Sequence, residues 1–310
     1  MLDIQGHRGA RGLLPENTLP AFARALSIGV TTLELDCAIT RDGVVVVSHD
    51  STLNPDITRG ADGQWIKRAD LPINAYTIAE LQQFDVGRID PASDYAGRFP
   101  RQQPVDDTRM PSLDEVFALA RRAGNDAVRF NIETKLSPLH PQRTVAPDVF
   151  AQALIAVIQR NRLDARATIQ SFDWRTLAVV QREAPRIQTV YLSAQQPFMD
   201  NILAHDASSP WNAGLHVSQF GGSVPRMVRA AGGALNVIWS PCADDVNAAN
   251  VREAHALGLA VVVWTVNAEA DMRAMLALDV DGIISDYPDL LRRVAGEAGY
   301  ALPLATPVTV

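Results

Sequence analysis

Cysteine is scarce in this sequence of 310 residues, which contains only Cys37 and Cys242. Two cysteines do not make a disulfide scaffold, so we expect free, buried thiols. Long apolar runs are also missing, and without a stretch of about 18 apolar residues no membrane span is expected. The N-terminal segment MLDIQGHRG has neither a basic start nor an apolar stretch and does not resemble a signal peptide. We therefore expect a cytoplasmic protein, or a periplasmic or secreted one if an export signal has been removed.

Several catalytic patterns are absent as well. No G-x-G-x-x-G, G-x-S-x-G or C-x-x-C motif occurs, so a nucleotide cradle, a serine elbow and a zinc knuckle lack support. An excess of basic residues is missing too, and the net charge of −7 argues against nucleic acid or an anionic lipid surface as partner. The 47% of hydrophobic and 20% of charged residues instead predict a globular chain with a substantial core.

Short apolar runs of strand length alternate with helical patterns, and several are apolar throughout, as expected for strands covered on both faces. Eight strand–helix units predict the α/β class and a (β/α)8 TIM barrel, with an open doubly wound sheet as the structural alternative. An extra strand is expected in VVVVSH (44–49). The eight runs are LDIQG (2–6), TTLELDC (31–37), VRFNIET (128–134), ATIQSF (167–172), QTVYLS (188–193), LNVIWS (235–240), AVVVWTV (260–266) and GIISD (282–286).

Capping residues and apolar stripes mark the intervening helices. The stripes include Phe150, Leu154, Val157 and Ile158, and further on Met272, Met275 and Leu276. The expected N-caps are Asn17, Asp244, Thr77 and Ser112, the last two forming capping boxes with Glu80 and Glu115.

We predict a single domain that spans residues 1–310. Residues 51–111 are rich in Pro, Gly, Asp and Arg, and we predict that they form an insertion after the second strand region. Residues 194–232 form a smaller irregular stretch. Long insertions at the strand ends of a barrel usually shape its site. No feature of the sequence indicates an oligomeric state.

Glu34 and Asp36 are two residues apart in TTLELDC, so on a strand both point to the same face. If the opposite face meets the helices, both acids enter the barrel. Two neighbouring carboxylates in a low-dielectric interior require a proton, a cationic side chain or a metal ion. The alternative is an edge strand whose acids face water.

The stretch FNIETK repeats this pattern, with Asn131, Glu133 and Lys135 on one face. A third acid and an ammonium group would then reach the same interior. Three carboxylates from two strands form an oxygen-rich site suited to Mg²⁺ or Ca²⁺ rather than to zinc. The alternative is an internal salt bridge between Glu133 and Lys135.

His7 and His49 each lie at a predicted strand end near the acids. An imidazole titrates near neutrality and can give or take a proton, although a lone histidine after a strand is more often structural. Arg8 offers a planar guanidinium for phosphate oxygens. Trp264 is either core filler or an apolar wall for a ligand, and Asp286 either belongs to a site at a strand's C-terminal end or caps a helix.

Taken in order along nearly the whole chain, the stretches HRGARGLLPENT, ELD, TRDGVVVVSHD, IETK, WTVN and DGIISDYPD resemble the glycerophosphodiester phosphodiesterase family. Each motif is weak by itself, but their order makes the resemblance specific. It implies a TIM barrel with a phosphodiesterase site at its C-terminal face and a small glycerophosphodiester as substrate. The implied products are sn-glycerol 3-phosphate and an alcohol such as choline or ethanolamine.

The resemblance also implies residue roles. The general acid/base pair would be His7 and His49, and one divalent cation, Ca²⁺ or Mg²⁺, would be the cofactor. The implied cation ligands are Glu34, Asp36 and Glu133, the implied phosphate-binding residues are Arg8 and Lys135, Trp264 would contact glycerol, and Asn17 would orient the site.

Other functions stay open at this point. The chain could cleave a lipid, as a lysophospholipase D or a phosphatidylinositol phospholipase C does. From other classes, it could be a barrel lyase or isomerase, or a non-catalytic binding barrel. The first nucleophile could be water or the substrate's own hydroxyl group, which would give a cyclic phosphate.

Overall fold

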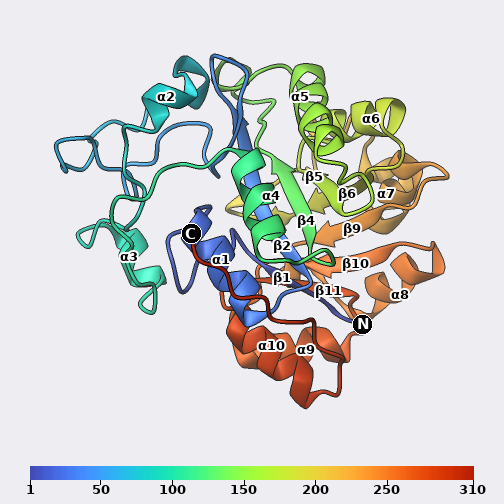
Figure 1. The fold of residues 1–310 in the computed structure, drawn as a ribbon. Helices are drawn as coiled ribbons and strands as arrows, with labels where there is room; N and C mark the ends of the chain where they lie inside the picture. The colour runs from blue at the N-terminus through green and yellow to red at the C-terminus, as the bar shows by residue number, and fades with distance from the viewer.

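The computed structural model, which describes residues 1–310, contains eight parallel strands that close into a barrel (Figure 1). Each strand pairs with the next barrel strand along the chain, and the first also pairs with the last. The barrel strands are β1 (Asp3–Gly6), β2 (Thr32–Ile39), β4 (Arg129–Thr134), β5 (Ala167–Ser171), β6 (Gln188–Ser193), β9 (Ile238–Pro241), β10 (Ala260–Val263) and β11 (Gly282–Ser285). The predicted (β/α)8 barrel is therefore confirmed. The open doubly wound sheet is excluded, because such a sheet would leave its two edge strands unjoined.

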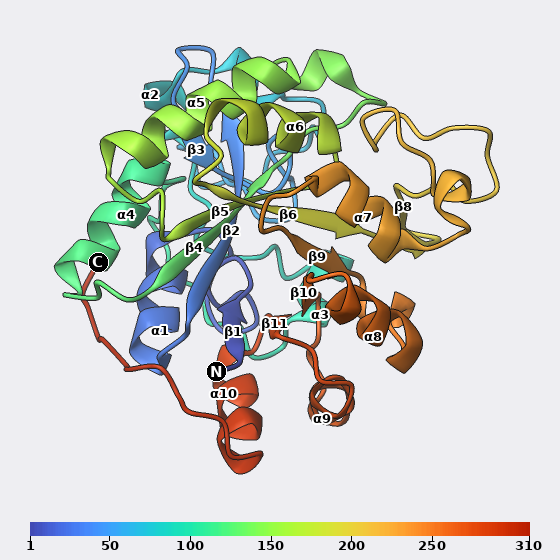
Figure 2. The ribbon, with the colours of Figure 1, turned by 90° about the vertical axis from the view of Figure 1, so that its right-hand side faces the viewer.

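A helix follows each barrel strand and packs on the outside of the barrel (Figures 1 and 2). The outer helices are α1 (Leu19–Ile28), α4 (Leu113–Arg122), α5 (Pro147–Arg160), α6 (Trp174–Glu183), α7 (Val224–Gly232), α8 (Ala248–Ala256), α9 (Glu269–Ala277) and α10 (Pro288–Glu297). The main hydrophobic core lies between these helices and the strands. None of the helices combines the length and the apolar character needed to cross a bilayer.

Side-chain alternation on β2 divides its residues as expected. Leu33, Leu35 and Cys37 are fully buried in the core beneath the helices, which leaves Glu34 and Asp36 on the opposite, inner face. Both cysteines of the chain are free and buried, as predicted. The edge-strand alternative for the two acids is wrong, because β2 pairs with β1 on one side and with β4 on the other.

Of the four predicted N-caps, two are confirmed and two are wrong. Thr77 and Ser112 form the predicted capping boxes. Thr18, not Asn17, accepts the N-cap hydrogen bond of α1, since Asn17 has a φ of 56° and directs its side chain to Asp36 instead. Asn247 caps α8, while Asp244 lies upstream in the 3-10 turn η4 (Ala243–Asp245).

The apolar stripes and strand ends need smaller corrections. The stripe from Phe150 to Ile158 is buried on α5, as expected. On α9 only Met272 is buried, while Met275 and Leu276 are half-buried. Strand β10 ends at Val263, so Trp264 lies just beyond it.

The chain between β3 (Val45–Val47) and α4 passes to one side of the barrel (Figure 1). Strand β3 pairs antiparallel with the C-terminal half of β2. The predicted insertion at 51–111 falls in this part of the chain, which contains η1 (Ile73–Ala75), α2 (Ile78–Leu81) and α3 (Asp94–Arg98).

The irregular stretch after β6 includes a hairpin of β7 (Gln195–Gln196) and β8 (Met199–Asp200), followed by η3 (Val217–Phe220). Another short turn, η2 (Pro141–Arg143), precedes α5.

Candidate active site

A cavity of about 690 Å³ opens among the loops that follow the barrel strands, and all but one of the predicted site residues line it. The exception is Asn17, which is buried and donates a hydrogen bond of 2.9 Å to Oδ2 of Asp36. Strand ends of a closed parallel barrel meet at one mouth, so residues far apart in sequence can share one site there. The predicted residues that line the cavity are His7, Arg8, Glu34, Asp36, His49, Glu133, Lys135 and Trp264.

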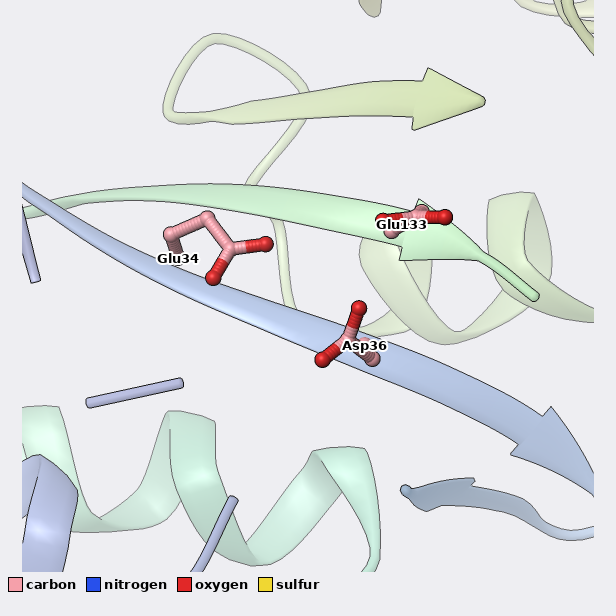
Figure 3. A group of neighbouring side chains, drawn as sticks. All are labelled: Glu34, Asp36 and Glu133. Atoms are coloured by element: carbon pink, nitrogen blue, oxygen red, sulfur yellow. The ribbon is translucent and has the colours of Figure 1, made fainter. Parts of the chain in front are cut away.

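Three carboxylates that line this cavity lie close together (Figure 3). Glu34 and Asp36 project from β2, and Glu133 projects from β4, where it pairs in register with Asp36. One oxygen of each group lies within 4.8 Å of the corresponding oxygens of the other two. Hard oxygen donors converging in this way suit Mg²⁺ or Ca²⁺. The predicted acidic cluster is therefore present in the fold.

The three carboxylates differ in their electrostatic environment. Burial and the nearby Asp36 carboxylate raise the pKa of Glu34 well above its usual range. Burial also raises the pKa of Glu133 to about 7, although Lys135 acts in the opposite direction. Burial alone would raise the pKa of Asp36, but Arg8, His49 and Lys135 outweigh it and hold that pKa well below its usual range. A cationic partner at this point would relieve the repulsion among the acids.

Two cations contact the carboxylates, the buried Arg8 and the partly buried Lys135. Nζ of Lys135 lies 2.8 Å from Oε1 of Glu133 and 3.8 Å from Oδ1 of Asp36. The salt bridge that the sequence left as an alternative is thus formed, and it belongs to the site. Nη1 of Arg8 lies 2.6 Å from Oε1 of Glu16, and its Nε lies 3.2 Å from Oδ2 of Asp36. Both cations are therefore fixed beside the acids rather than free to swing.

His7 is held in place by Asp286. Its Nδ1 lies 2.7 Å from Oδ1 of Asp286, and its Nε2 lies 3.9 Å from Oε2 of Glu34. Asp286 also accepts two hydrogen bonds from Arg11, at 2.6 and 2.9 Å, and one from Asn267 at 2.7 Å. Helix α10 has no side-chain N-cap, so Asp286 belongs to the site and does not cap that helix. Burial and Arg11 lower the pKa of His7 to about 4, against the opposing effect of Asp286.

His49 has a carboxylate partner of its own. Its Nδ1 lies 2.9 Å from Oδ1 of Asp50, and Asp50 in turn accepts a hydrogen bond of 2.9 Å from Asn54. The imidazole is 33% exposed, against 12% for that of His7. Burial, Arg8 and Lys135 lower the pKa of His49. Both histidines therefore have Nδ1 engaged by a carboxylate, which leaves Nε2 as the nitrogen available for proton transfer.

Apolar side chains that follow β4, β5, β6 and β10, together with one from α9, cover part of the cavity wall. Trp264 donates its indole N–H to the carbonyl of Ser240 at 3.0 Å, and its ring meets Phe172 edge to face at a centroid distance of 5.4 Å. Further apolar residues on the wall are Leu136, Leu192, Phe198, Met199, Trp211 and Met275. Trp264 thus packs against Phe172 and also lines the cavity, so it is both a packing residue and part of the cavity wall.

Several residues of the site were not predicted, although they lie in recognisable sequence patterns. Glu16 lies within the PENT segment, and Arg11 follows Arg8 in the same glycine-rich turn. Gln170 lies two residues from Thr168 on β5 with the apolar Ile169 between them, so both face the barrel interior, but only Gln170 lines the cavity. Tyr95, which donates to Glu16, has no comparable signal, because it lies on the short helix α3 in a stretch without a periodic pattern, far along the chain from Glu16.

The closed barrel and its charged mouth define a (β/α)8 enzyme suited to an anionic substrate. Residues 7–290 match the glycerophosphoryl diester phosphodiesterase family, and the chain belongs to this family. Membership confirms the resemblance seen in the sequence and makes the protein a hydrolase of phosphoric diesters. The binding-barrel and lyase alternatives are therefore no longer needed.

Individual relatives support the same assignment. The chain is 29% identical over 296 residues to a glycerophosphodiester phosphodiesterase of Bacillus subtilis, covering 93% of this chain and 84% of the relative. A human lysophospholipase D is 23% identical over 309 residues, covering 96% and 86%. A solved structure from Silicibacter pomeroyi, a candidate glycerophosphoryl diester phosphodiesterase, is 37% identical with a TM-score of 0.83 and coverage of 96% and 94%.

A more distant solved structure shows the same fold. It is an Oleispira antarctica phosphodiesterase in complex with the product sn-glycerol-3-phosphate, 21% identical with a TM-score of 0.65. The alignment covers 94% of this chain and 96% of the other.

Proposed function

We propose that this enzyme hydrolyses glycerophosphodiesters to sn-glycerol 3-phosphate and an alcohol, with one divalent cation bound by Glu34, Asp36 and Glu133. The single observation that carries the proposal is the convergence of these three carboxylates in one cavity with two histidines and with the cations Arg8 and Lys135. The product bound to the Oleispira antarctica relative supports the glycerol phosphate half of the substrate. Mg²⁺ and Ca²⁺ both suit a site of three carboxylates.

Arg8 and Lys135 bind and orient the phosphodiester in this proposal. The cation, when bound, withdraws charge from the non-bridging oxygens as the ester bond is exchanged. The guanidinium of Arg8 and the ammonium of Lys135 add positive charge on the same side, and their carboxylate partners keep them in place before the substrate arrives. Preorganised charges of this kind favour the transition state because they need no reorientation during the reaction.

His7 and His49 transfer the protons. One imidazole removes a proton from the attacking hydroxyl through Nε2, and the other donates a proton to the leaving alkoxide, which would otherwise be too basic to depart. Asp286 and Asp50 fix the two rings by their Nδ1 atoms. The attacking oxygen comes either from water or from a neighbouring hydroxyl of the substrate, and ³¹P NMR of the products distinguishes the two because only the second route forms a cyclic phosphate.

A monoacyl glycerophosphodiester is a second candidate substrate, and the apolar wall of the cavity favours it. Phe198 lines the cavity and yet is 69% exposed, so an acyl chain that leaves the cavity could cover its ring. The human relative named as a lysophospholipase D supports the same substrate class.

A coupled assay for glycerol 3-phosphate release tests the proposal. Glycerophosphocholine, glycerophosphoethanolamine and lysophosphatidylcholine are offered with Mg²⁺, with Ca²⁺ or after treatment with a chelator, and choline release is measured in parallel. We expect cation-dependent release of glycerol 3-phosphate from the first two substrates. Full activity after chelation would contradict the cation site, and failure to cleave any diester would contradict the proposed function.

A further inference from the structure

Gln170 has no role in the mechanism above, although its side chain reaches the acidic cluster from within the barrel. It lies on β5 and is 1% exposed. Its Nε2 donates a hydrogen bond of 2.7 Å to Oε1 of Glu34. The second oxygen of Glu34 accepts the backbone N–H of Arg8 at 2.9 Å. Each carboxylate oxygen of Glu34 is therefore held by one donor of the protein.

A chain of buried amides determines which end of Gln170 faces Glu34. Nδ2 of Asn131 donates to Oε1 of Gln170 at 2.9 Å and to Oε1 of Gln5 at 3.0 Å. Oδ1 of Asn131 accepts from the hydroxyl of Thr168 at 2.8 Å. If the amide of Gln170 were flipped, its NH₂ would face that of Asn131 and its oxygen would face the carboxylate of Glu34. Both contacts would be repulsive, so the network fixes the NH₂ of Gln170 on Glu34.

The position of this network inside the barrel makes it rigid. Gln5, Asn131 and Gln170 come from three different strands, and none is more than 3% exposed. Val190, Ile238, Val262 and Ile284 form a buried apolar cluster from four further strands of the barrel. Water cannot readily replace a lost partner in such surroundings, so each amide keeps the orientation that its neighbours impose.

We propose that Gln170 is a positioning residue that holds the Glu34 carboxylate in the orientation needed to bind the divalent cation. The inference rests on the proposed function, because it presupposes that Glu34 is a cation ligand. With one lone pair of each oxygen engaged by Gln170 or Arg8, the remaining lone pairs of Glu34 are directed to the cavity that Asp36 and Glu133 share. Loss of a residue that orients a metal ligand typically weakens metal binding about 10- to 100-fold.

The matched variants are Q170M and T168V. Methionine has nearly the volume of glutamine but cannot donate to Glu34. T168V removes the hydroxyl group that donates to Oδ1 of Asn131 at the other side of the same network. It leaves the hydrogen bond between Gln170 and Glu34 intact. Circular dichroism and thermal melting first establish that each variant folds. Q170N is the second choice if Q170M does not, because its shorter side chain cannot span both Asn131 and Glu34.

The experiment is calorimetric titration of chelator-treated wild type and variants with MgCl₂ and with CaCl₂, followed by kcat at saturating cation. We expect the Kd of Q170M for the cation to rise about 10- to 100-fold, T168V to bind as wild type does, and saturating cation to restore most of the kcat of Q170M. Wild-type affinity in Q170M would overturn the inference, as would equal losses in Q170M and T168V. A wild-type protein that binds neither ion would overturn the proposed cation site together with the inference.

Discussion

Oδ1 of Asp286 lies 2.7 Å from Nδ1 of His7, although the two residues are 279 positions apart in the chain. Pairing between β1 and β11 closes the barrel and brings the ends of these strands together, with Gly6 opposite Ser285. Arg11 and Asn267 hold the carboxylate of Asp286 from the other side. The ring of His7 is thereby fixed with Nε2 3.9 Å from Oε2 of Glu34, so the closure of the barrel determines the geometry of the site.

Replacement of Asp286 by Asn should disable His7 without unfolding the barrel. Asparagine has nearly the same shape, but it presents no negative charge to the imidazole or to Arg11. We expect kcat to fall by at least about 10²-fold, since proton transfer by a positioned side chain contributes about 10²- to 10⁴-fold. Steady-state kinetics at several pH values checks this. D289N is the control, because Asp289 contacts Arg101 at the surface of α10. Near-wild-type turnover in D286N would show that His7 does not depend on this carboxylate.

His49 can be tested against a histidine of the same exposure elsewhere in the protein. His255 is also 33% exposed, and its Nε2 lies 3.0 Å from Oδ2 of Asp281, outside the cavity. We expect H49A to lower kcat by about 10²- to 10⁴-fold and H255A to leave it unchanged, with similar melting temperatures for both. If H49A retained wild-type turnover, His49 would have no part in proton transfer, and the same measurement on H7A examines the second imidazole.

The acidic cluster could be predicted from the sequence because side chains alternate between the two faces of a strand. Residues two apart on a strand share a face, so Glu34 and Asp36 had to point together, and the parallel strand that carries Glu133 ends at the same mouth. The barrel could be predicted as well, because eight strand-length apolar runs alternate with helical patterns along the chain. What fixed the inward direction was the apolar opposite face, on which Leu33, Leu35 and Cys37 pack under the helices.

Contacts that depend on the three-dimensional path of the chain could not be predicted in this way. Asn17 and Thr18 are both good capping residues, and only the position of Asp36 shows that Asn17 is engaged there. Tyr95 lies on the short helix α3 and Phe198 in the hairpin of β7 and β8, both in stretches without hydrophobic periodicity, so nothing in their spacing places them at the site. The partnership of His7 with Asp286 became visible only once the barrel had closed.

The pH dependence of stability should report on Glu133. Burial raises the pKa of its carboxyl from the ordinary value of 4.5 to about 7. The folded state then binds a proton that the unfolded state releases, so the cation-free protein loses stability as the pH rises from about 4.5 to 7. The slope from this group is at most about 1.4 kcal/mol per pH unit. Urea unfolding of chelator-treated wild type and E133Q measures it, and we expect a shallower slope in E133Q. Parallel slopes in the two proteins would exclude Glu133 as the source.

Tyr95 connects the segment beyond β3 to the cations of the site. Its hydroxyl donates to Oε2 of Glu16, whose other oxygen binds Arg8. Y95F removes this donor and leaves Glu16 partly unsatisfied, and hydrogen bonds to charged groups contribute about 1.5–3 kcal/mol. We expect a loss of stability of that size in urea unfolding, together with a higher KM as Arg8 becomes less well fixed. Y76F is the control, since Tyr76 packs edge to face against Phe84 and does not line the cavity. An unchanged KM in Y95F would show that Tyr95 does not affect substrate binding through Glu16 and Arg8.

Phe198 offers a direct test of whether an acyl chain uses the apolar wall of the cavity. F198S removes an apolar ring at the cavity entrance, and burial of such a side chain contributes about 1.5–3 kcal/mol, which corresponds to roughly tenfold or more in affinity. We therefore expect the KM for lysophosphatidylcholine, measured below its critical micelle concentration, to rise by about tenfold, and the KM for glycerophosphocholine to stay unchanged. L139S is the matched control, because Leu139 is 62% exposed but does not line the cavity. Equal changes for both substrates would mean that Phe198 shapes the site in general. An unchanged KM for both substrates would contradict the proposed contact between Phe198 and an acyl chain. The deacylated glycerophosphodiesters would then remain as the proposed substrates.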